Sequence, residues 1–316
     1  MNIETSVVRA PVNTKKHKLL TKIWYYRHIY LFLLPAVVWY AVFKYYPMYG
    51  VLLAFKDFKY NLGITGSPWA GLRFFKDFLT DPVFYEVIRN TLSISFLKLA
   101  FGFPAPIFLA LMLNEVIHSK FKRVVQTVSY LPHFVSWVVV VTLLQKMLSP
   151  NAGLINDIRT QIGLDPVYYM GKVELFYPLV VLSDVWKGIG WGSIVYLSSL
   201  TNIDPNLYEA AEIDGAGRWR KMVSITLPCL TPTISILLIF SLSGILSAGF
   251  EQIYLMQTPA TLTLSEILDT YVLKMGILDG QFSYSTAIGL FSSLVGLILI
   301  VFVNWASKKL SDTSLW

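Results

Sequence analysis

The stretch EAAEIDGAGRWRKMVSITLP, residues 209–228, interrupts an otherwise apolar chain with three acidic and three basic side chains. Of the 316 residues, 55% are hydrophobic and only 14% are charged. A typical soluble protein is about 25% charged. The low charge content therefore favours a membrane protein, in which a polar run of this kind belongs to a loop between membrane-spanning segments.

Six windows are long and apolar enough to cross a bilayer core about 30 Å thick, which takes about 20 residues of helix. One such window also occurs as a buried helix of a large soluble protein, but six in one chain leave too little polar surface for solubility. The sequence therefore predicts an all-α integral membrane protein with six transmembrane helices. The windows cover about residues 29–48, 88–113, 124–146, 176–200, 228–249 and 285–305.

The Lys and Arg residues set the expected orientation, because cytoplasmic loops carry an excess of them. With the N-terminus inside, the cytoplasmic segments hold 14 of these residues over about 75 positions, and the outer segments hold 8 over about 100. We therefore expect both termini, and the loop at 209–228, in the cytoplasm. The same distribution explains the net charge of +7 without a nucleic-acid partner.

These spans divide the chain into four expected parts. A cytoplasmic basic leader at 1–28 precedes the first transmembrane helix and its extracellular loop, 29–86, and a core of five transmembrane helices, 87–305, precedes a cytoplasmic tail, 306–316. The end of the leader suits a helix lying on the inner leaflet, and its first part suits a disordered tail equally well. The aromatic-rich outer loop suits either contact with an extracellular partner or packing across the mouth of the bundle.

The polar run carries the signals of two short helices joined by a turn. Asp204 is a good N-cap, and Pro205 suits the first helical position, where its missing N–H costs nothing. Gly215 is placed to end this helix in a left-handed conformation, and Pro228 marks the junction of the second helix with the fifth span. We name residues 204–228 the elbow. Local physics alone leaves two roles open for it: docking a partner, or lying flat on the membrane surface.

The elbow also resembles the EAA loop of the permease subunits of ABC importers. The motif is filled almost completely and at the family's spacing. In such importers this loop is the coupling helix that sits in a groove of a separate ATPase subunit. The residues that match, and that the resemblance assigns to ATPase coupling, are Glu209, Ala210, Ala211, Asp214, Gly215, Ile225, Leu227 and Pro228.

A wider similarity, over about residues 29–310, is to the oligosaccharide and polysaccharide permeases of the LplB type, within the binding-protein-dependent, MetI-like type I class. The segments that carry it include YLPHFVSWVVV, FEQIYLM and NWASKKL. The resemblance implies a multi-pass protein of the bacterial cytoplasmic membrane. Its cargo would be an oligosaccharide derived from a complex polysaccharide, with acidic, uronate-containing ones among the candidates.

The resemblance also implies the partners. They are a second, homologous permease, two ATPase subunits and an extracellular sugar-binding protein, with lipid around the spans. The sequence agrees with this division of labour, because it contains no G-x-x-x-x-G-K-[ST] phosphate loop. We therefore expect no cofactor on this chain, with ATP and Mg²⁺ bound by the ATPase, and no enzymatic activity of its own.

Polar side chains inside the spans mark the candidates for the sugar path, because such residues are costly in lipid and tend to face a cavity or a partner. In the fourth span Asp184 and Lys187 lie one helical turn apart and suit a mutual ion pair, while tryptophan faces suit sugar rings. A purely structural role for this group is equally open, as it is for the cluster after the fifth span and for Lys98. The candidates are Asp184, Trp186, Lys187, Trp191, Glu251, Gln252 and Tyr254.

Gly188 and Gly192 stand at G-x-x-x-G spacing, which predicts close packing of the fourth span against a neighbouring helix. The four histidines and the single cysteine, Cys229, show no metal-ligand spacing, and no acid or histidine cluster suggests catalysis. A membrane enzyme and an ion-driven carrier therefore remain the weaker interpretations, since neither accounts for the elbow.

Overall fold

The structure, a computed structural model, describes residues 22 and 24–311. All regular elements of this part are helical, and extended pairing is confined there to one bridge between Lys56 and Trp69. Most of the predicted leader, residues 1–28, and the end of the predicted tail, 306–316, lie outside the described residues. The chain divides into two compact units, with the boundary between Leu52 and Leu53.

The first unit is a single helical rod in its described part. α2 (Arg27–Tyr40) continues through the π-helical η1 (Ala41–Tyr45) into the 3₁₀-helical η2 (Tyr46–Phe55), of which residues 53–55 belong to the second unit. The continuous helix Arg27–Phe55 has 29 residues and is apolar enough to cross a membrane. No α2 side chain is buried within this unit.

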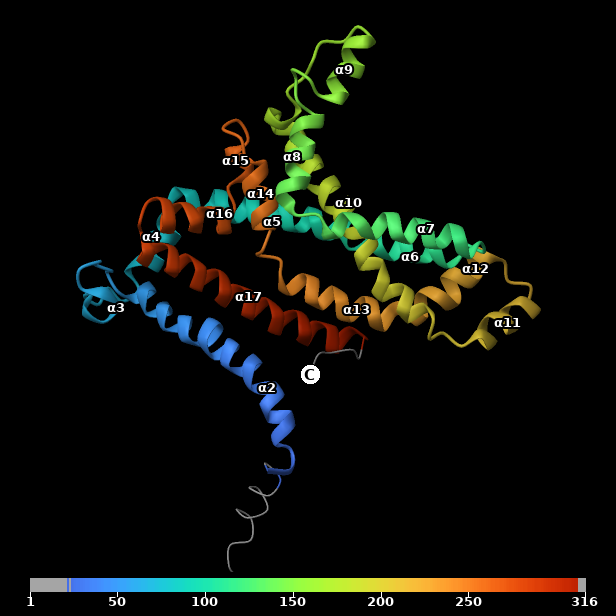
Figure 1. Ribbon diagram of the computed structural model, residues 1–316, viewed down its shortest axis with the longest axis horizontal. Coiled ribbons are helices and arrows are strands. Elements are labelled where there is room, and N and C mark those ends of the chain that lie inside the picture. The colour runs from blue at the N-terminus through green and yellow to red at the C-terminus, as the bar shows by residue number, and fades with distance from the viewer. Residues whose placement is uncertain (1–21, 23, 312–316) are drawn as a thin grey trace, which may run out of the picture. The chain divides into compact units, whose positions relative to one another are not determined.

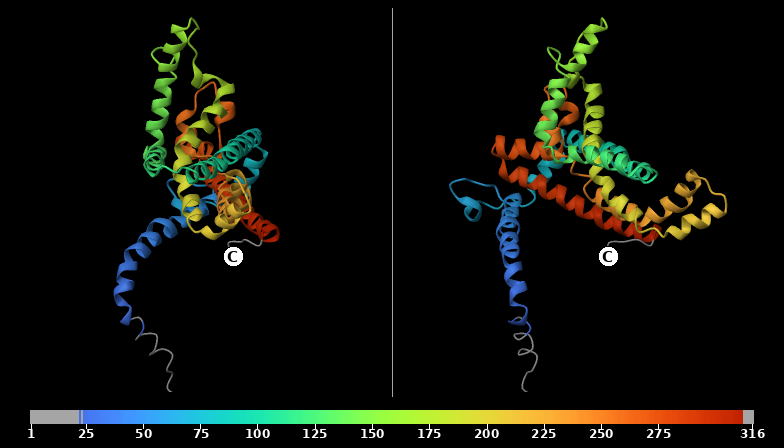
Figure 2. Two further views of the ribbon diagram at one scale, coloured as in Figure 1. Left: turned by 90° about the vertical axis from the view of Figure 1, so that its right-hand side faces the viewer. Right: turned by 45° about the vertical axis from the view of Figure 1, so that its right-hand side comes forward.

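The second unit holds the remaining helices, which Figures 1 and 2 show from three directions. They are α3 (Gly63–Gly66), α4 (Arg73–Thr80), α5 (Pro82–Gly102), α6 (Pro104–Asn114), α7 (Ser119–Tyr130), η3 (Leu131–Phe134), α8 (Trp137–Met147), α9 (Leu154–Gln161), η4 (Tyr169–Gly171), α10 (Val173–Leu200), α11 (Pro205–Ile213), α12 (Arg218–Lys221), η5 (Met222–Thr226), α13 (Leu227–Ser243), α14 (Phe250–Met256), α15 (Leu262–Ser265), α16 (Leu268–Leu273), η6 (Lys274–Leu278) and α17 (Phe282–Ser311).

Four helices of the described chain are long and apolar enough to cross a membrane, and one bent pair brings the number to five. α10 has 28 residues and is long enough, but it does not reach the same apolar standard, because it includes Glu174, Asp184 and Lys187. The chain is thus an all-helical membrane protein with four or five candidate spans. The single helices are Arg27–Phe55, Pro82–Asn114, Arg218–Ser243 and Phe282–Trp305.

The predicted third span, 124–146, is not one straight helix. Ser119–Phe134 and Trp137–Met147 meet at an angle of 100°. Pro132 lacks an N–H and restricts the residue before it, so the α-helix gives way to the short η3. Ser136 then caps the new helix α8 by accepting a hydrogen bond from the backbone N–H of Val139 (3.4 Å). Apolar composition predicted the span but not this break.

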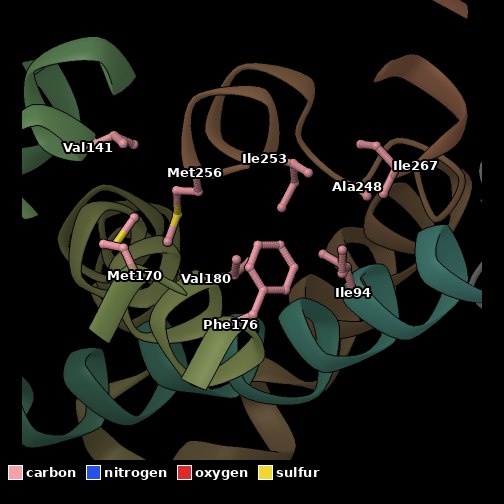
Figure 3. Packing of buried hydrophobic residues seen from close by; sticks show 9 residues of the cluster. All are labelled: Ile94, Val141, Met170, Phe176, Val180, Ala248, Ile253, Met256 and Ile267. Carbon is pink, nitrogen blue, oxygen red and sulfur yellow. The ribbon is translucent and has the colours of Figure 1, made fainter. Parts of the chain in front are cut away.

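Three clusters of buried side chains hold the second unit together. Nine side chains from α5, α8, η4, α10, α14 and the loops around them form the largest cluster (Figure 3). At one end of α13, Leu230 packs with Leu200 of α10, close to the elbow. Just beyond the other end, Leu246 packs with Ile288 of α17 and Phe78 of α4. α4 and the elbow therefore lie at opposite ends of the bundle.

The outer loop packs on the bundle through the start of α17. The Ser283 hydroxyl donates to the carbonyl of Lys56 (2.6 Å) and accepts from the backbone N–H of Phe58 (3.0 Å). The rings of Phe58 and Tyr60 pack edge-on against Phe282. Of the two roles considered for this loop, the structure shows packing on the bundle.

α8 packs against α14, and beyond it α9 extends away from the other helices of the second unit (green, Figures 1 and 2). Asn156 ties this extension together from a buried position: its amide donates to the carbonyls of Ser149 (2.8 Å) and Val167 (2.9 Å), and its oxygen accepts from the N–H of Val167 (2.7 Å). A single polar side chain therefore satisfies backbone groups of the two loops that flank α9, which a buried amide can do without an orphaned atom.

Candidate coupling elbow and substrate cavities

The first arm of the elbow, α11, begins as the sequence predicts. The carboxylate of Asp204 accepts from the backbone N–H of Asn206 (3.0 Å), and Pro205 occupies the first turn. The cap satisfies one N–H that the helix leaves unpaired, and the proline supplies none that needs pairing.

α11 ends in a Schellman turn built around Gly215. The N–H of Ala216 donates to the carbonyl of Ala211 (2.8 Å), and the N–H of Gly215 donates to that of Glu212 (3.0 Å). Gly215 has φ +74°, whereas an added Cβ would meet nothing within 4 Å. Glycine is therefore required here by backbone conformation and not by space.

The second arm differs from the expected separate helix. α12 continues through the π-helical η5 into α13, so that Arg218–Ser243 forms one 26-residue helix that begins in the elbow and ends in the bundle. Pro228 lies within its path, and the wider π turn just before it accommodates the hydrogen bond that proline cannot donate. The elbow is thus joined rigidly to a candidate span.

Two side-chain contacts hold the arms against each other. The ammonium of Lys221 lies 3.1 Å from a carboxylate oxygen of Glu212, and the hydroxyls of Tyr208 and Thr226 are 2.9 Å apart. Between the arms is a cavity of about 140 Å³ lined partly by Ala211. The small alanine at this place leaves room between the arms that a larger side chain would fill.

The predicted coupling residues lie on the elbow with different exposures. Glu209 and Ala210 are exposed on α11, as are Asp214 and Gly215 at its turn. Ala211 is half-buried between the arms. On the second arm Ile225 is half-buried, and Leu227 and Pro228 are exposed. Within the described part of the chain nothing covers the exposed coupling residues, so their surface is accessible to another protein.

A first cavity, of about 530 Å³, lies between α5, α10 and α13. Its wall includes Lys98 from α5, Asp184 and Tyr196 from α10, and Phe240 from α13. Asp184 and Gly188 also line a second cavity, of about 500 Å³, beside the bend between α7 and α8. Both volumes are in the range of small-molecule sites, about 300–1,000 Å³.

The ion pair of the first cavity is not the predicted one. Asp184 does not pair with Lys187 on its own helix; its carboxylate lies 3.2 Å from the ammonium of Lys98 on α5. Lys98 also donates to the carbonyl of Ala248 (2.8 Å), just before Gly249, whose φ is +91°. A Cβ at Gly249 would come within 2.6 Å of the ammonium, so the Lys98 side chain packs directly against the turn at Gly249. Lys98 thus joins α5, α10 and the break between α13 and α14.

Lys187 lies on the wall of the second cavity instead. Its ammonium donates to the carbonyl of His133 (2.7 Å) and lies 5.5 Å from the centre of the Trp137 ring. His133 stacks flat on Trp191, with ring centres 4.4 Å apart. The bend between α7 and α8 therefore supplies the aromatic rings beside Lys187.

Of the other sugar-path candidates, one lines a cavity and the rest are buried or lie at the surface. Glu251 lines the second cavity. Gln252 is fully buried and donates to the carbonyl of Val180 and to the hydroxyl of Ser183, each at 2.8 Å, so it ties α14 to α10. Trp186 is 51% exposed, and Tyr254 stacks on Phe250 at the surface.

The glycines of α10 act differently from the predicted pair. Gly192 lies against Pro106 of α6, as close packing requires, but Gly188 has open space beside it. The closest approach is at Gly190, where a Cβ would overlap the backbone of Ser129 in α7. The spacing therefore located the contact with α6 at Gly192 but missed Gly190, on which the contact with α7 depends.

Sequence reasoning also missed the residues that the bend contributes. His133, Phe134 and Trp137 all line the second cavity. Their signal in the sequence is weak: Pro132 and His133 interrupt an apolar window, which marks a bend but not its direction. Among the described residues no three His, Cys, Asp or Glu side chains form a group that could hold a metal ion.

Comparison with known families now identifies the chain. Residues 102–312 match the model of the binding-protein-dependent transport system inner membrane component family. The chain belongs to this family. It is a multi-pass permease of the inner membrane, the transport subunit of an ABC system, and not itself an enzyme.

Two relatives from Bacillus subtilis support this assignment. The polygalacturonan/rhamnogalacturonan transport system permease YteP of Bacillus subtilis (strain 168) is 44% identical over 302 residues, which is 96% of this chain and 94% of YteP. The protein LplB of the same strain is 44% identical over 288 residues, 91% of each chain. The expected resemblance to LplB-type permeases is therefore confirmed.

Two crystal structures contain chains with a closely similar fold. A chain of a bacterial ABC transporter involved in the import of the acidic polysaccharide alginate has a TM-score of 0.85 and 40% identity, covering 93% of this chain and 99% of that one. A chain of the bacterial alginate ABC transporter in complex with an alginate pentasaccharide-bound periplasmic protein has a TM-score of 0.86 and 39% identity, covering 94% of this chain and all of that one.

Proposed function

We propose that this permease carries an acidic oligosaccharide, derived from a complex polysaccharide, from an extracellular binding protein into the cell. The names of the relatives support the cargo: polygalacturonan and rhamnogalacturonan for one, alginate for another. The complex of the alginate transporter with a periplasmic protein supports a binding protein as the donor. The second permease, the two ATPase subunits, and ATP with Mg²⁺ on them complete the proposed assembly.

We further propose that the elbow transmits the ATPase cycle to the bundle. The observation that carries this is its continuity with a candidate span: displacement of the exposed α11 surface acts on Arg218–Ser243 through the ion pair Lys221–Glu212 and the contact of Tyr208 with Thr226. In this assignment Glu209 makes a polar contact with the ATPase, Ala210 and Ala211 allow its close approach, and Gly215 makes the turn. Ile225, Leu227 and Pro228 hold the second arm.

The same proposal includes six spans with both termini in the cytoplasm. α10 is the span that apolar composition alone does not support, and its cavity-lining side chains explain its polarity. The elbow and α4 lie at opposite ends of the bundle, in keeping with a cytoplasmic elbow and an extracellular outer loop. An ion-driven carrier is disfavoured because it leaves the elbow without a role.

The test is uptake by the intact assembly. The complex is purified from native membranes in mild detergent, reconstituted into liposomes with its binding protein, and supplied with labelled oligogalacturonate. We expect uptake that requires Mg-ATP and the binding protein. Uptake that persists without ATP and follows a proton gradient would contradict the proposal.

A further inference from the structure

Lys187 is a cation without a carboxylate partner in the described part of the chain. Asp184, one turn away on α10, is held by Lys98, and no Asp or Glu oxygen among the described residues lies within 4.0 Å of the Lys187 ammonium. An unpaired charge in a membrane bundle is costly and marks a functional position. The interhelical pair thus leaves one positive charge of α10 available to a ligand.

The ammonium of Lys187 is held in place but not saturated. One strong hydrogen bond runs to the carbonyl of His133 (2.7 Å) and one long contact to that of Pro132 (3.4 Å). An ammonium group has three N–H donors, so at least one remains for a ligand. Because the carbonyl and the Trp137 ring fix the position of the group, binding an anion there loses little conformational freedom.

The walls around Lys187 suit a sugar ring. Phe134, 71% exposed, and Trp137 offer apolar faces in a cavity of about 500 Å³. Glu251, from α14, is exposed on the same wall and is a hydrogen-bond acceptor for hydroxyl groups. Two carboxylates face the cavity. Asp184 is neutralised by Lys98, and Glu251 would repel a second anionic group placed next to it.

We propose that this cavity is a subsite for one uronate residue of the cargo, with Lys187 binding the sugar carboxylate, Phe134 and Trp137 packing on the ring, and Glu251 accepting from its hydroxyls. The proposal rests on the proposed function and adds to it the residue that reads the acid group. A charge-assisted hydrogen bond from a fixed ammonium is among the stronger contacts available to a carboxylate.

The test separates the charge of Lys187 from its hydrogen bond to His133. Lys187→Gln keeps an N–H donor and removes the charge, Lys187→Arg keeps both, and Lys146→Gln removes an exposed lysine of α8 outside the cavity. In reconstituted complexes, Lys187→Gln should lower ATP-dependent uptake of oligogalacturonate at subsaturating concentration about tenfold. Lys187→Arg and Lys146→Gln should stay within about twofold of the unmodified protein.

Chemical restoration of the charge gives a second, independent readout. Cys229 is the only cysteine of the chain, so Lys187→Cys is made together with Cys229→Ala. Aminoethyl methanethiosulfonate attaches an ammonium group and should recover most of the uptake; methyl methanethiosulfonate attaches a neutral group and should not. Cys229→Ala alone, treated with both reagents, controls for cysteines of the partner subunits.

The outcomes distinguish the two proposals. If Lys187→Gln transports oligogalacturonate as well as the unmodified protein, or if both reagents restore uptake equally, the charge is not used and the subsite is refuted. If the unmodified complex couples ATP hydrolysis to its binding protein but imports neither oligogalacturonate nor alginate oligosaccharides, the proposed cargo is wrong and the subsite falls with it.

Discussion

The elbow and the cavity wall around Asp184 are held by contacts of different range. The side-chain contacts within the elbow join residues no more than 18 positions apart, as between Tyr208 and Thr226. In the cavity wall, Lys98 of α5 binds Ala248, which is 150 positions away in the break between α13 and α14, and Asp184 on α10. The elbow is therefore a local structure attached to the bundle, whereas the cavity wall exists only once the bundle has assembled.

This difference predicts where the effect of a substitution appears. Changes in the elbow should alter local order and ATPase coupling while leaving the bundle folded. Changes in the cavity wall should alter the stability of the whole second unit, because each group there joins several helices. The following substitutions test this contrast.

The largest effect is expected from breaking the pair Lys98–Asp184. Removing one partner of a buried ion pair leaves the other charge uncompensated, which costs about 3–5 kcal/mol when burial is complete. Because the Asp184 side chain is 30% exposed, we expect Lys98→Met to lower the free energy of unfolding by about 2–3 kcal/mol. Unfolding in mixed dodecyl maltoside and SDS micelles measures it.

The double variant Lys98→Met with Asp184→Leu is the control for this pair. It removes both charges, so no unpaired charge remains in the apolar wall and most of the lost stability should be recovered. If the double variant is destabilised by the sum of the single effects, the two side chains do not act as a pair.

Smaller changes in the free energy of unfolding are expected at two glycines of α10, and the two changes should differ in sign. Gly190→Ala places a methyl group against the backbone of Ser129 and should cost about 1–3 kcal/mol. Gly188→Ala meets nothing within 4 Å and should stabilise the helix by up to about 1 kcal/mol. The same unfolding assay measures both. Equal effects of the two substitutions would contradict the packing of α7 on α10 described above.

In the elbow, the conformation of Gly215 predicts a local effect. Gly215→Ala forces an L residue to φ +74° and should cost about 1 kcal/mol within the turn. Gly217→Ala, at φ −70°, is the matched control. Amide hydrogen exchange over residues 205–216 should quicken about fivefold in the first variant and hardly in the second, while exchange in α10 and α17 stays unchanged. Faster exchange throughout the bundle would contradict a local elbow.

The smallest effect is expected from the cap of α11. Asp204→Ala removes the acceptor for the N–H of Asn206 and should cost about 0.5–1 kcal/mol. Asp204→Asn keeps an acceptor and should be nearly neutral. Hydrogen exchange at the first turn of α11 follows both, and identical exchange in the two variants would show that the cap does not stabilise the helix.

The contrast also explains what could be predicted from the sequence. The start, the end and the turn of α11 follow from Asp204, Pro205 and Gly215, because caps and turns depend on residues a few positions apart. The apolar windows likewise identified the long helices. The π turn before Pro228 was not foreseen, since only the finished helix shows how the missing hydrogen bond is accommodated.

The cavity wall could be predicted only in part. Asp184 and Lys187 were selected as costly polar residues inside a span and Glu251 as part of the cluster after the fifth span, and all three line a cavity. Their partners could not be selected, because one-turn spacing favours Asp184 with Lys187 and gives no sign that α5 brings Lys98 alongside. The residues of the bend were missed for the same reason: the 100° turn that brings them to the cavity is a tertiary feature.

The most direct measurement of the central claim, that the elbow couples this permease to an ATPase, is purification from native membranes with two matched variants. Gly215→Asp places a charged side chain at the exposed left-handed turn, whereas Gly217→Asp places the same charge two positions on, in extended backbone that favours an N-cap carboxylate. We expect the ATPase to accompany the unmodified chain and Gly217→Asp, and its amount to fall at least about tenfold with Gly215→Asp while all three chains remain in the membrane. Equal amounts of ATPase, with equal ATP-driven uptake, in both variants would contradict the claim.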